Sequence, residues 1–335
     1  MFNKIYEKIK KFIKENYKEL IVYIIIFIIC VFPLPYYIYI GGGTIDLEKR
    51  IELEGKQTGS YNLAYVKQMH ATPPTYLLSL ILKSWELESI NESKIDENES
   101  VKEIDRRERL YLEEANNNAI INAYKLAGSD ITIKNSYYKV ISVSKESDTN
   151  VEVGDTLISV NNIKITSNKE YKEYLKTLNI GDKVNIKVKR NNQEIDCYAK
   201  IIEFQNQKLI GLYLVNISDY EVNPKINLKF KWNESGPSGG FMLSLAIYDR
   251  LVEEDLAKGR KIVGTGTIDS DGNVGEIGGV KYKLMGAVSN KADIFFVPKD
   301  NYEEAMKVKK EFNYKIKVVS VEKLEDAINY LKTTK

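Results

Sequence analysis

The longest apolar run of the chain lies near its N-terminus. Residues 20–40 (LIVYIIIFIICVFPLPYYIYI) contain no charged side chain. At about 1.5 Å per residue, a helix of this length reaches the ~30 Å hydrocarbon thickness of a bilayer. Isoleucine occupies every helical face, so the run lacks the single apolar stripe of a core helix. The pattern predicts a transmembrane helix over residues 20–40, with Pro33 and Pro35 near its outer end.

Charge before this run suggests its orientation. Residues 1–19 carry six lysines against three glutamates. By the positive-inside rule they form a cytoplasmic basic tail, which predicts a single-pass protein of the cell membrane with the rest of the chain outside the cell. A cleaved signal peptide is the alternative, but it needs a shorter apolar core and small residues at a cleavage site, and PLPYYIYIGGG has no A-x-A arrangement.

The next region, residues 44–128, mixes strand and helix patterns. Two possible strands, residues 45–55 and 59–68, precede the run LLSLIL (77–82), which is too short to span a bilayer and is predicted to lie in a core. Residues 86–118 are dense in charge and indicate a solvated helix or a mobile connector. The end of the region, EEANNNAIINAYKLAG, reads as a helix that ends at Gly128. We expect this region to be part of the C-terminal domain or packed on it.

Short alternating strands follow over residues 129–205, interrupted by one helix at 168–178. With VEVGDTLISVNNIKI (151–165), this region resembles a PDZ domain of the kind found in bacterial proteases. The resemblance implies a β-rich domain that binds an extended peptide as an added strand. Its loop for the peptide carboxylate falls at Tyr137, Tyr138, Lys139 and Val140, but the glycine-rich loop of the family is missing. A spacer domain with a blocked groove is the alternative.

Composition removes several kinds of site. The net charge of +2 over 335 residues gives no electrostatic case for nucleic-acid binding. His70 is the only histidine, so multi-histidine metal sites are excluded, and we expect neither a metal nor a cofactor. Cys30 and Cys197 are far apart in sequence and match neither a zinc pattern nor an expected disulfide.

Residues 233–243 (NESGPSGGFML) place Ser238 among glycines and a proline, just before an apolar helical pattern. By itself this could be an ordinary turn. It could also hold a nucleophilic hydroxyl at a helix N-terminus, where unpaired N–H groups stabilise negative charge. In that case the backbone at Gly236, Pro237 and Gly239 forms the oxyanion-binding segment, and glycines admit a substrate backbone closely.

A second segment, residues 261–298, reads as a strand, a hairpin, a Gly-Gly turn, a lysine-bearing helix and a buried strand. With its TGT and IGGVKYK motifs and the earlier GPSGG, it resembles the proteolytic domain of Lon-type serine peptidases. The resemblance runs to about residue 333 and gives a domain over residues 206–335. It implies an α+β fold and a Ser-Lys dyad, with Ser238 as nucleophile, Lys283 as general base and Thr265 orienting the lysine amine.

A lysine base must be neutral, although its ordinary pKa is ~10.4. Burial can lower the pKa of a lysine by several units, towards the ~7–8 range of a useful base. The predicted apolar wall around this helix consists of Ile277, Leu284, Met285 and Val288. Lys281 points about 200° away from Lys283 on a helix, and we expect it to be exposed beside the site.

The sequence departs from Lon-type enzymes that contain an ATPase. Ser235 and Thr267 stand where those enzymes often have acidic residues, and the interval from serine to lysine is two residues longer. No G-x-x-x-x-G-K-[ST] motif is present. These features predict a membrane-anchored, ATP-independent serine endopeptidase that cleaves exported peptides or unfolded proteins with PDZ assistance, with a homo-oligomer left open. The alternatives are a catalytically silent PDZ adaptor, an esterase or acyltransferase using the same dyad, and a hydrolase using His70.

Overall fold

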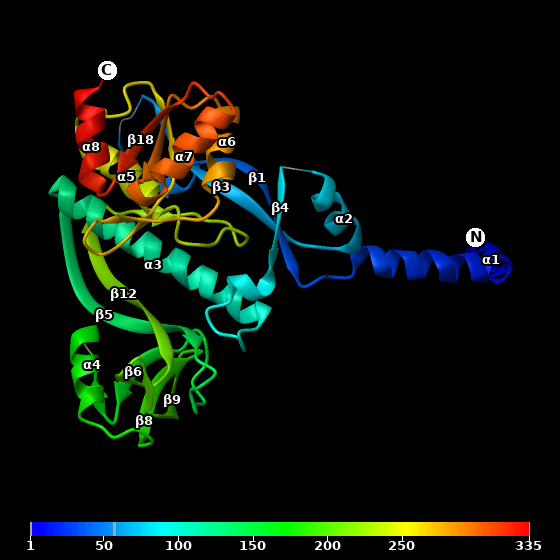
Figure 1. The fold of residues 1–335 in the computed structure, drawn as a ribbon, viewed down its shortest axis with the longest axis horizontal. Helices are drawn as coiled ribbons and strands as arrows, with labels where there is room; N and C mark the ends of the chain where they lie inside the picture. The colour runs from blue at the N-terminus through cyan, green and yellow to red at the C-terminus, as the bar shows by residue number, and fades with distance from the viewer. Residues whose placement is uncertain (1, 56–57, 83, 166, 335) are drawn as a thin grey trace. The chain divides into compact units, whose positions relative to one another are not determined.

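A computed structural model describes residues 2–55, 58–82, 84–165 and 167–334. The chain divides into two compact units. The first comprises Met1–Ile40 and Lys67–Ser93, and the second comprises Gly41–Val66 and Lys94–Lys335. The candidate residues of the C-terminal domain and the predicted PDZ domain all belong to the second unit (Figure 1).

The first unit begins with α1 (Phe2–Val31), which is kinked at Asn16, and continues into β1 (Tyr36–Asp46). Within this unit β1 pairs antiparallel with β4, from Tyr36 opposite Ser89 to Ile40 opposite Trp85. His70 lies near the ring of Tyr37, with centroids 4.9 Å apart. The remaining elements are the end of β3 (Ser60–His70), α2 (Pro73–Ile81), β4 (Trp85–Ser89) and the short helix η2 (Ile90–Ser93).

The transmembrane helix predicted over residues 20–40 is wrong. The helix ends at Val31, because Pro33 and Pro35 follow it, and the run YYIYI that completes the apolar segment forms a strand instead. Among the described residues, none of the helices combines the length and the apolar character that a membrane crossing needs. The extracellular location was inferred from the same segment and stays a prediction.

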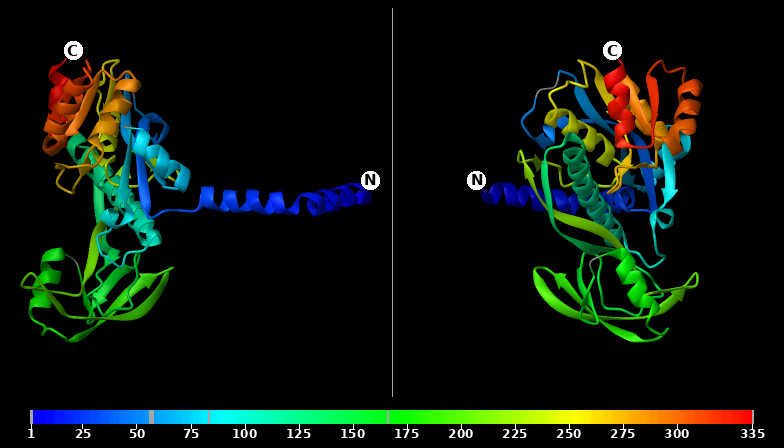
Figure 2. Two further views of the ribbon diagram at one scale, coloured as in Figure 1. Left: turned by 45° about the vertical axis from the view of Figure 1, so that its right-hand side comes forward. Right: turned by 90° about the vertical axis from the view of Figure 1, so that its left-hand side faces the viewer.

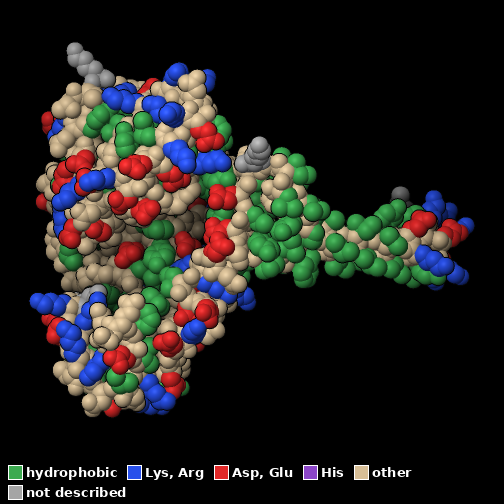
Figure 3. All heavy atoms as spheres, viewed as in Figure 1, with side chains coloured by type: hydrophobic (Ala, Val, Ile, Leu, Met, Phe, Trp, Pro, Cys, Tyr) green, Lys and Arg blue, Asp and Glu red, His purple; other side chains and the backbone are tan. Residues whose placement is uncertain are grey.

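The core position predicted for residues 77–82 is also wrong. No side chain of α2 is buried, and Leu77, Leu80 and Ile81 are more than half exposed. Figure 3 shows the resulting apolar surface over α2 and the apolar part of α1. A short apolar pattern has the same appearance whether or not another element covers it.

The second unit contains most of a mixed sheet with the order β18-β17-β14-β3-β1-β4. Strands β3, β14 (Lys261–Gly264), β17 (Ile294–Pro298) and β18 (Lys317–Val321) are parallel. Alternate side chains enter two cores: Ile262 and Phe296 face α5 (Gly240–Leu251) and α8 (Leu324–Thr333), whereas Val263 and Phe295 face α6 (Val280–Ser289) and α7 (Lys299–Glu311). Figure 1 shows these helix pairs on the two sides of the sheet.

Residues 44–66 supply strands to this sheet, because β3 pairs with β14. Helix α3 (Val101–Ala127) then packs on α5; it begins with a capping box of Ser100 and Glu103 and ends at Gly128, whose φ of +67° suits glycine. Residues 86–118, predicted as a solvated helix or connector, belong to β4, η2 and the N-terminal part of α3, and α3 is not simply solvated, because it buries Ile104 and Leu110. Three short elements complete this part: η1 (Leu47–Lys49), β2 (Ile51–Glu52) and β13 (Asn227–Leu228), which pairs with β2.

Between α3 and β13 the chain leaves through β5 (Asp130–Val143) and returns through β12 (Leu212–Asn223), which pair along their whole length. Figure 2 shows α3 running beside both strands. The segment between them has its own core, including Val140, Leu175 and Ile186, and a sheet with the order β12-β5-β6-β8-β9. Its other elements are β6 (Thr156–Val160), β7 (Ile163–Lys164), α4 (Asn168–Lys176), β8 (Lys183–Arg190), β9 (Gln193–Lys200), β10 (Ile202–Phe204) and β11 (Gln207–Leu209).

Candidate active site

Ser238 lies in a turn that ends one residue before α5. The turn is fastened on both sides: Gly236 N–H donates to the carbonyl of Glu108 on α3 at 2.9 Å, and Glu234 forms an ion pair with Arg50. Gly236 has a φ of +89°, a conformation that side-chain-bearing residues rarely adopt. Ser238 is therefore held at the N-terminus of a buried helix, as the sequence predicts.

The other glycines of the turn are required for packing. A Cβ added to Gly239 would lie 2.6 Å from Cδ2 of Leu63, and one added to Gly240 would lie 2.8 Å from Cγ2 of Ile268. Contacts this short do not occur between real carbon atoms. The sequence predicts that these glycines admit a substrate backbone, and in the structure they also allow the close approach of side chains from β3 and β15 (Thr267–Ile268).

Thr265 follows β14 and is fully buried. Its Oγ1 donates to the main-chain carbonyl of Ser238 at 3.1 Å, and Gly266 N–H donates to the same oxygen at 2.8 Å. The return bond from Phe241 N–H to the Gly266 carbonyl joins α5 to this segment. Thr265 thus orients the backbone of Ser238, and its predicted role in orienting the lysine amine stays a prediction.

Lys283 is in the second turn of α6, which starts after Gly279, and its side chain is almost completely buried. Burial lowers the pKa of Lys283 to about 8. Among the described residues, its amine has neither a hydrogen-bond partner nor an ion-pair partner to offset this effect. Of the predicted apolar wall, Ile277 and Leu284 are buried, whereas Met285 and Val288 are half-buried.

Lys281 is half-buried rather than exposed, and its amine lies 5.6 Å from the ring centroid of Tyr282. The two lysines therefore differ in surroundings. Only Lys283 combines nearly complete burial with a lowered pKa, which are the properties of a lysine that loses its proton near neutral pH.

The elements that carry Ser238 and Lys283 meet at one end of the sheet. Helix α5 packs on one face and α6 on the other, and α6 packs directly against β14. Ser238 is bonded to the residues that follow the carboxyl end of β14. In the described parts of the chain, neither Ser238 Oγ nor Lys283 Nζ has a hydrogen-bond partner, so both remain available for a reacting group. Catalytic hydrogen bonds are often absent or long before substrate binds.

Three asparagines that the sequence argument overlooked hold the loops around this end of the sheet. Asn301 Oδ1 accepts from Ile277 N–H at 2.9 Å, and its Nδ2 donates to the Ile277 carbonyl at 3.0 Å, just before the Gly-Gly turn of α6. From α3, Asn118 and Asn122 donate to the main chain of the hairpin formed by β15 and β16 (Val274–Gly275). In the sequence, these asparagines could have been found as polar residues on otherwise apolar faces of predicted helices.

Two segments of the chain match known families. Residues 232–333 match the Lon protease (S16) C-terminal proteolytic domain, and residues 126–201 match the PDZ domain. The chain carries a Lon-type proteolytic domain and a PDZ domain. The segment that matches the Lon-type domain contains Ser238, Thr265 and Lys283.

The curated relatives are Lon proteases. The chain is 30% identical over 125 residues to the Lon protease of Campylobacter jejuni, covering 32% of this chain and 15% of the relative. It is 32% identical over 120 residues to Lon protease 2 of Borreliella burgdorferi, covering 34% and 14%. The chain therefore spans about one seventh of the length of these relatives. A solved PDZ domain of an SdrC-like protein from Listeria monocytogenes is 25% identical and covers 26% of this chain and 93% of its own, with a TM-score of 0.22.

The PDZ residues predicted to bind a peptide carboxylate do not form a loop. Tyr138, Lys139 and Val140 lie inside β5, where β12 pairs along one edge and β6 or Asp155 occupies the other. Their strand-like alternation continues the pattern of the preceding residues, which explains why they extend the strand. The free edge of this sheet next to β5 belongs to β12.

Within the described residues, no cluster of His, Cys, Asp or Glu is arranged to hold a metal ion. Cys30 is exposed and Cys197 is buried, and both are free thiols.

Proposed function

We propose that the chain is a serine endopeptidase that works without ATP, with Ser238 as nucleophile and neutral Lys283 as general base. The observation that carries the proposal is the burial of Lys283 within a Lon-type domain, with a pKa of about 8. At neutral pH a useful fraction of such a lysine is already unprotonated, so it can accept a proton from a serine hydroxyl.

In the proposed reaction, Lys283 Nζ takes the proton of Ser238 Oγ while Oγ attacks the carbonyl carbon of the scissile peptide bond. The carbonyl electron pair moves to its oxygen, then returns and expels the amine, which takes the proton from Lys283. The resulting acyl-enzyme is hydrolysed by water, whose proton passes to Lys283 and then to Ser238 Oγ.

The oxyanion formed in this reaction needs N–H donors beside Ser238. Gly236 N–H is already bonded to Glu108, and Pro237 has no N–H group. Among the described residues, the N–H groups of Ser238 and Gly239 have no hydrogen-bond partner. We therefore narrow the oxyanion site from residues 236–239 to these two donors.

The substrate class follows from what the sequence lacks. Without a phosphate-binding loop motif there is no sign of an ATP-driven unfolding motor in this chain. A peptide bond enters a protease site in an extended conformation, so the proposed substrates are peptides and unfolded or locally unfolded proteins.

The PDZ domain is proposed to assist by binding peptide along the free edge of β12. Glu114 accepts from Asn216 N–H, and Asn117 bonds to both main-chain groups of Ser218, so α3 covers this part of the edge. The open part lies around Leu212 and Leu214, whose side chains pack against the same core as α4. An added strand here would extend the sheet through main-chain hydrogen bonds, as in other β-augmentation complexes.

The deciding experiment incubates the full chain with a chemically unfolded protein in the absence of ATP and follows fragments by mass spectrometry. We expect cleavage by the parent and by Lys281→Ala, and none by Ser238→Ala or Lys283→Ala. Cleavage of an ester but not of any polypeptide would instead support an esterase. Peptide binding without any cleavage would support the adaptor function.

A further inference from the structure

A carboxylate on α3 lies directly beside the nucleophile turn. The main-chain carbonyl of Glu108 accepts the N–H of Gly236 at 2.9 Å. A Cβ added to Gly236 would lie 3.4 Å from Oε2 of the same glutamate. Because Gly236 precedes Ser238 by only two residues, this oxygen is within reach of a substrate side chain next to the bond that Ser238 attacks.

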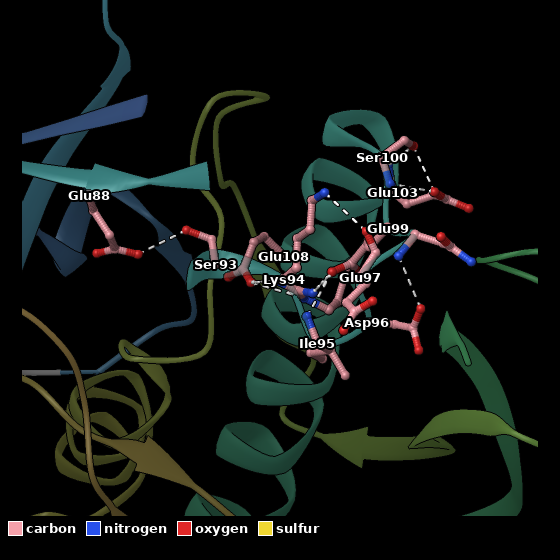
Figure 4. A network of polar contacts seen from close by, with 12 residues as sticks. Glu88, Ser93, Lys94, Ile95, Asp96, Glu97, Glu99, Ser100, Glu103 and Glu108 are labelled. Atoms are coloured by element: carbon pink, nitrogen blue, oxygen red, sulfur yellow. Dashed lines mark hydrogen bonds and ion pairs between the residues drawn. The ribbon is translucent and has the colours of Figure 1, made fainter. Parts of the chain in front are cut away.

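The neighbouring charges compensate the charge of Glu108 only in part. Arg107 forms a buried ion pair with Glu99, and it approaches Oε1 of Glu108 only at 3.4 and 3.5 Å, the outer limit of a hydrogen bond (Figure 4). Oε2 of Glu108 has no hydrogen-bond partner among the described residues. Two carboxylates thus share one guanidinium, and the group of three carries a net negative charge.

Glu108 is also partly withdrawn from water while remaining accessible. Its side chain is 35% exposed, and burial raises its pKa above the ordinary value. A raised pKa means that the ionised form lacks some of the stabilisation it has in water. A cation brought by a substrate would restore that stabilisation with a charge-assisted hydrogen bond.

We propose that Glu108 binds the ammonium or guanidinium group of a lysine or arginine next to the scissile bond, and so makes the peptidase selective for basic sequences. This inference rests on the proposed function of Ser238. The carboxylate supplies specificity by pairing with the substrate, and the main-chain carbonyl of the same residue holds the turn, so one residue fixes both the nucleophile turn and the subsite beside it.

The test uses quenched fluorescent peptides that differ only in lysine or norleucine, placed in turn at each position flanking the cleaved bond. A charged hydrogen bond corresponds to a selectivity of about tenfold or more. We expect the parent to show this ratio of kcat/KM in favour of lysine at one position at least. In Glu108→Gln, which keeps the main-chain carbonyl, the ratio falls to about one.

Glu113→Gln is the matched control, because it removes a carboxylate from the same helix that is instead paired with Lys139 of β5. Its selectivity should equal that of the parent. A parent that cleaves both peptides equally in a Ser238-dependent manner overturns the inference but leaves the proposed function standing. A lysine preference that persists in Glu108→Gln also overturns it. A parent that cleaves neither these peptides nor an unfolded protein overturns the proposed function.

Discussion

The hydroxyl of Thr265 donates a hydrogen bond to the main-chain carbonyl of Ser238 at 3.1 Å. That carbonyl belongs to the peptide unit whose N–H is on Gly239, one of the two proposed oxyanion donors. Thr265 therefore helps to set the direction in which the Gly239 N–H points. Together with Gly266 N–H, it fixes this peptide plane from the buried side.

Replacing Thr265 by valine keeps the shape of the side chain but removes the donor. Complete removal of an oxyanion donor costs about 2.7–4 kcal/mol in the transition state. We expect a smaller loss here, about tenfold in kcat/KM, because Gly266 N–H still holds the carbonyl and the donor is only partly misoriented. Thr265→Ser keeps the hydroxyl and should retain most of the activity. Equal activity in Thr265→Val and the parent would remove Thr265 from the site.

The pH dependence of cleavage should follow Lys283. Because burial lowers its pKa to about 8, the neutral amine that acts as base is scarce below this pH and dominant above it. We expect kcat/KM to rise about tenfold per pH unit below 8 and to level off above it. Lys281→Ala should show the same profile. A flat profile between pH 6.5 and 9 would exclude Lys283 as the base.

The same burial makes Lys283 a cost to stability. The folded-state pKa of about 8 lies below the ordinary value of 10.5, so folding is opposed wherever the unfolded lysine is protonated. The shift corresponds to roughly 3 kcal/mol at pH 7. Lys283→Met, which keeps the length of the side chain, should raise the free energy of unfolding by about 2–3 kcal/mol at pH 7 while abolishing cleavage.

Denaturant melts of the parent and Lys283→Met at several pH values measure this difference. It should shrink as the pH approaches 10, where the unfolded lysine also begins to lose its proton. A variant that is less stable than the parent at pH 7 would show that the amine has a compensating partner in the folded protein.

Asp249, near the C-terminal end of α5, should make the free energy of unfolding depend on pH in a second way. It is completely buried, and burial raises its pKa to about 6, although Leu256 N–H donates to Oδ1 at 2.7 Å and opposes the shift. A carboxyl group with a raised folded-state pKa favours folding as the pH falls from above 6 towards 4. Its contribution should change by roughly 2–3 kcal/mol over this range.

Asp249→Asn should remove this contribution, so the difference in unfolding free energy between parent and variant should depend on pH between 4 and 7. Other carboxylates of the chain titrate equally in both proteins and cancel. A difference that stays constant over this range would mean that Asp249 remains ionised in the folded protein.

Peptide binding by the PDZ domain should depend on the edge of β12. Leu214 N–H points to the same side as those of Asn216 and Ser218, because alternate residues of a strand share an orientation. We expect Leu214→Pro to abolish binding of a peptide selected from a random library on the inactive Ser238→Ala chain. Leu214→Ala should weaken it only modestly. Unchanged binding in the proline variant, measured by calorimetry, would exclude this edge.

Local sequence patterns predicted the structure correctly where it depends on a single helix or strand. The helix end at Gly128, the strand near residue 60 and the position of Ser238 before α5 all depend on neighbouring residues. The strand predicted over residues 45–55 is wrong, because most of that stretch forms η1 and the two-residue β2. Spacing along a helix indicated that only one of Lys281 and Lys283 can face the site, and the resemblance to Lon-type peptidases assigned that place to Lys283.

Distant partners decided the rest. Residues 36–40 became a strand because β4 pairs with them, and no pattern within the apolar run announces that partner. Tyr138 and Lys139 were expected in a loop, but β12 returns from far along the chain to pair with them. The bond from Gly236 to Glu108 likewise joins residues on either side of the whole PDZ domain.

The PDZ domain separates Glu108 from Gly236 along the chain, and this order affects when their contact can form during synthesis. Helix α3 leaves the ribosome before the PDZ domain and the nucleophile turn leaves after it, and the two can meet only when Asp130 and Asn223 at the ends of the inserted segment come together. Pairing of β5 with β12 brings the two ends of this long segment together. The entropic cost of closing a loop grows only slowly with the number of residues in it, so the length of the segment adds little to that cost. The contact between α3 and the nucleophile turn therefore forms late in synthesis, after the PDZ domain has been made.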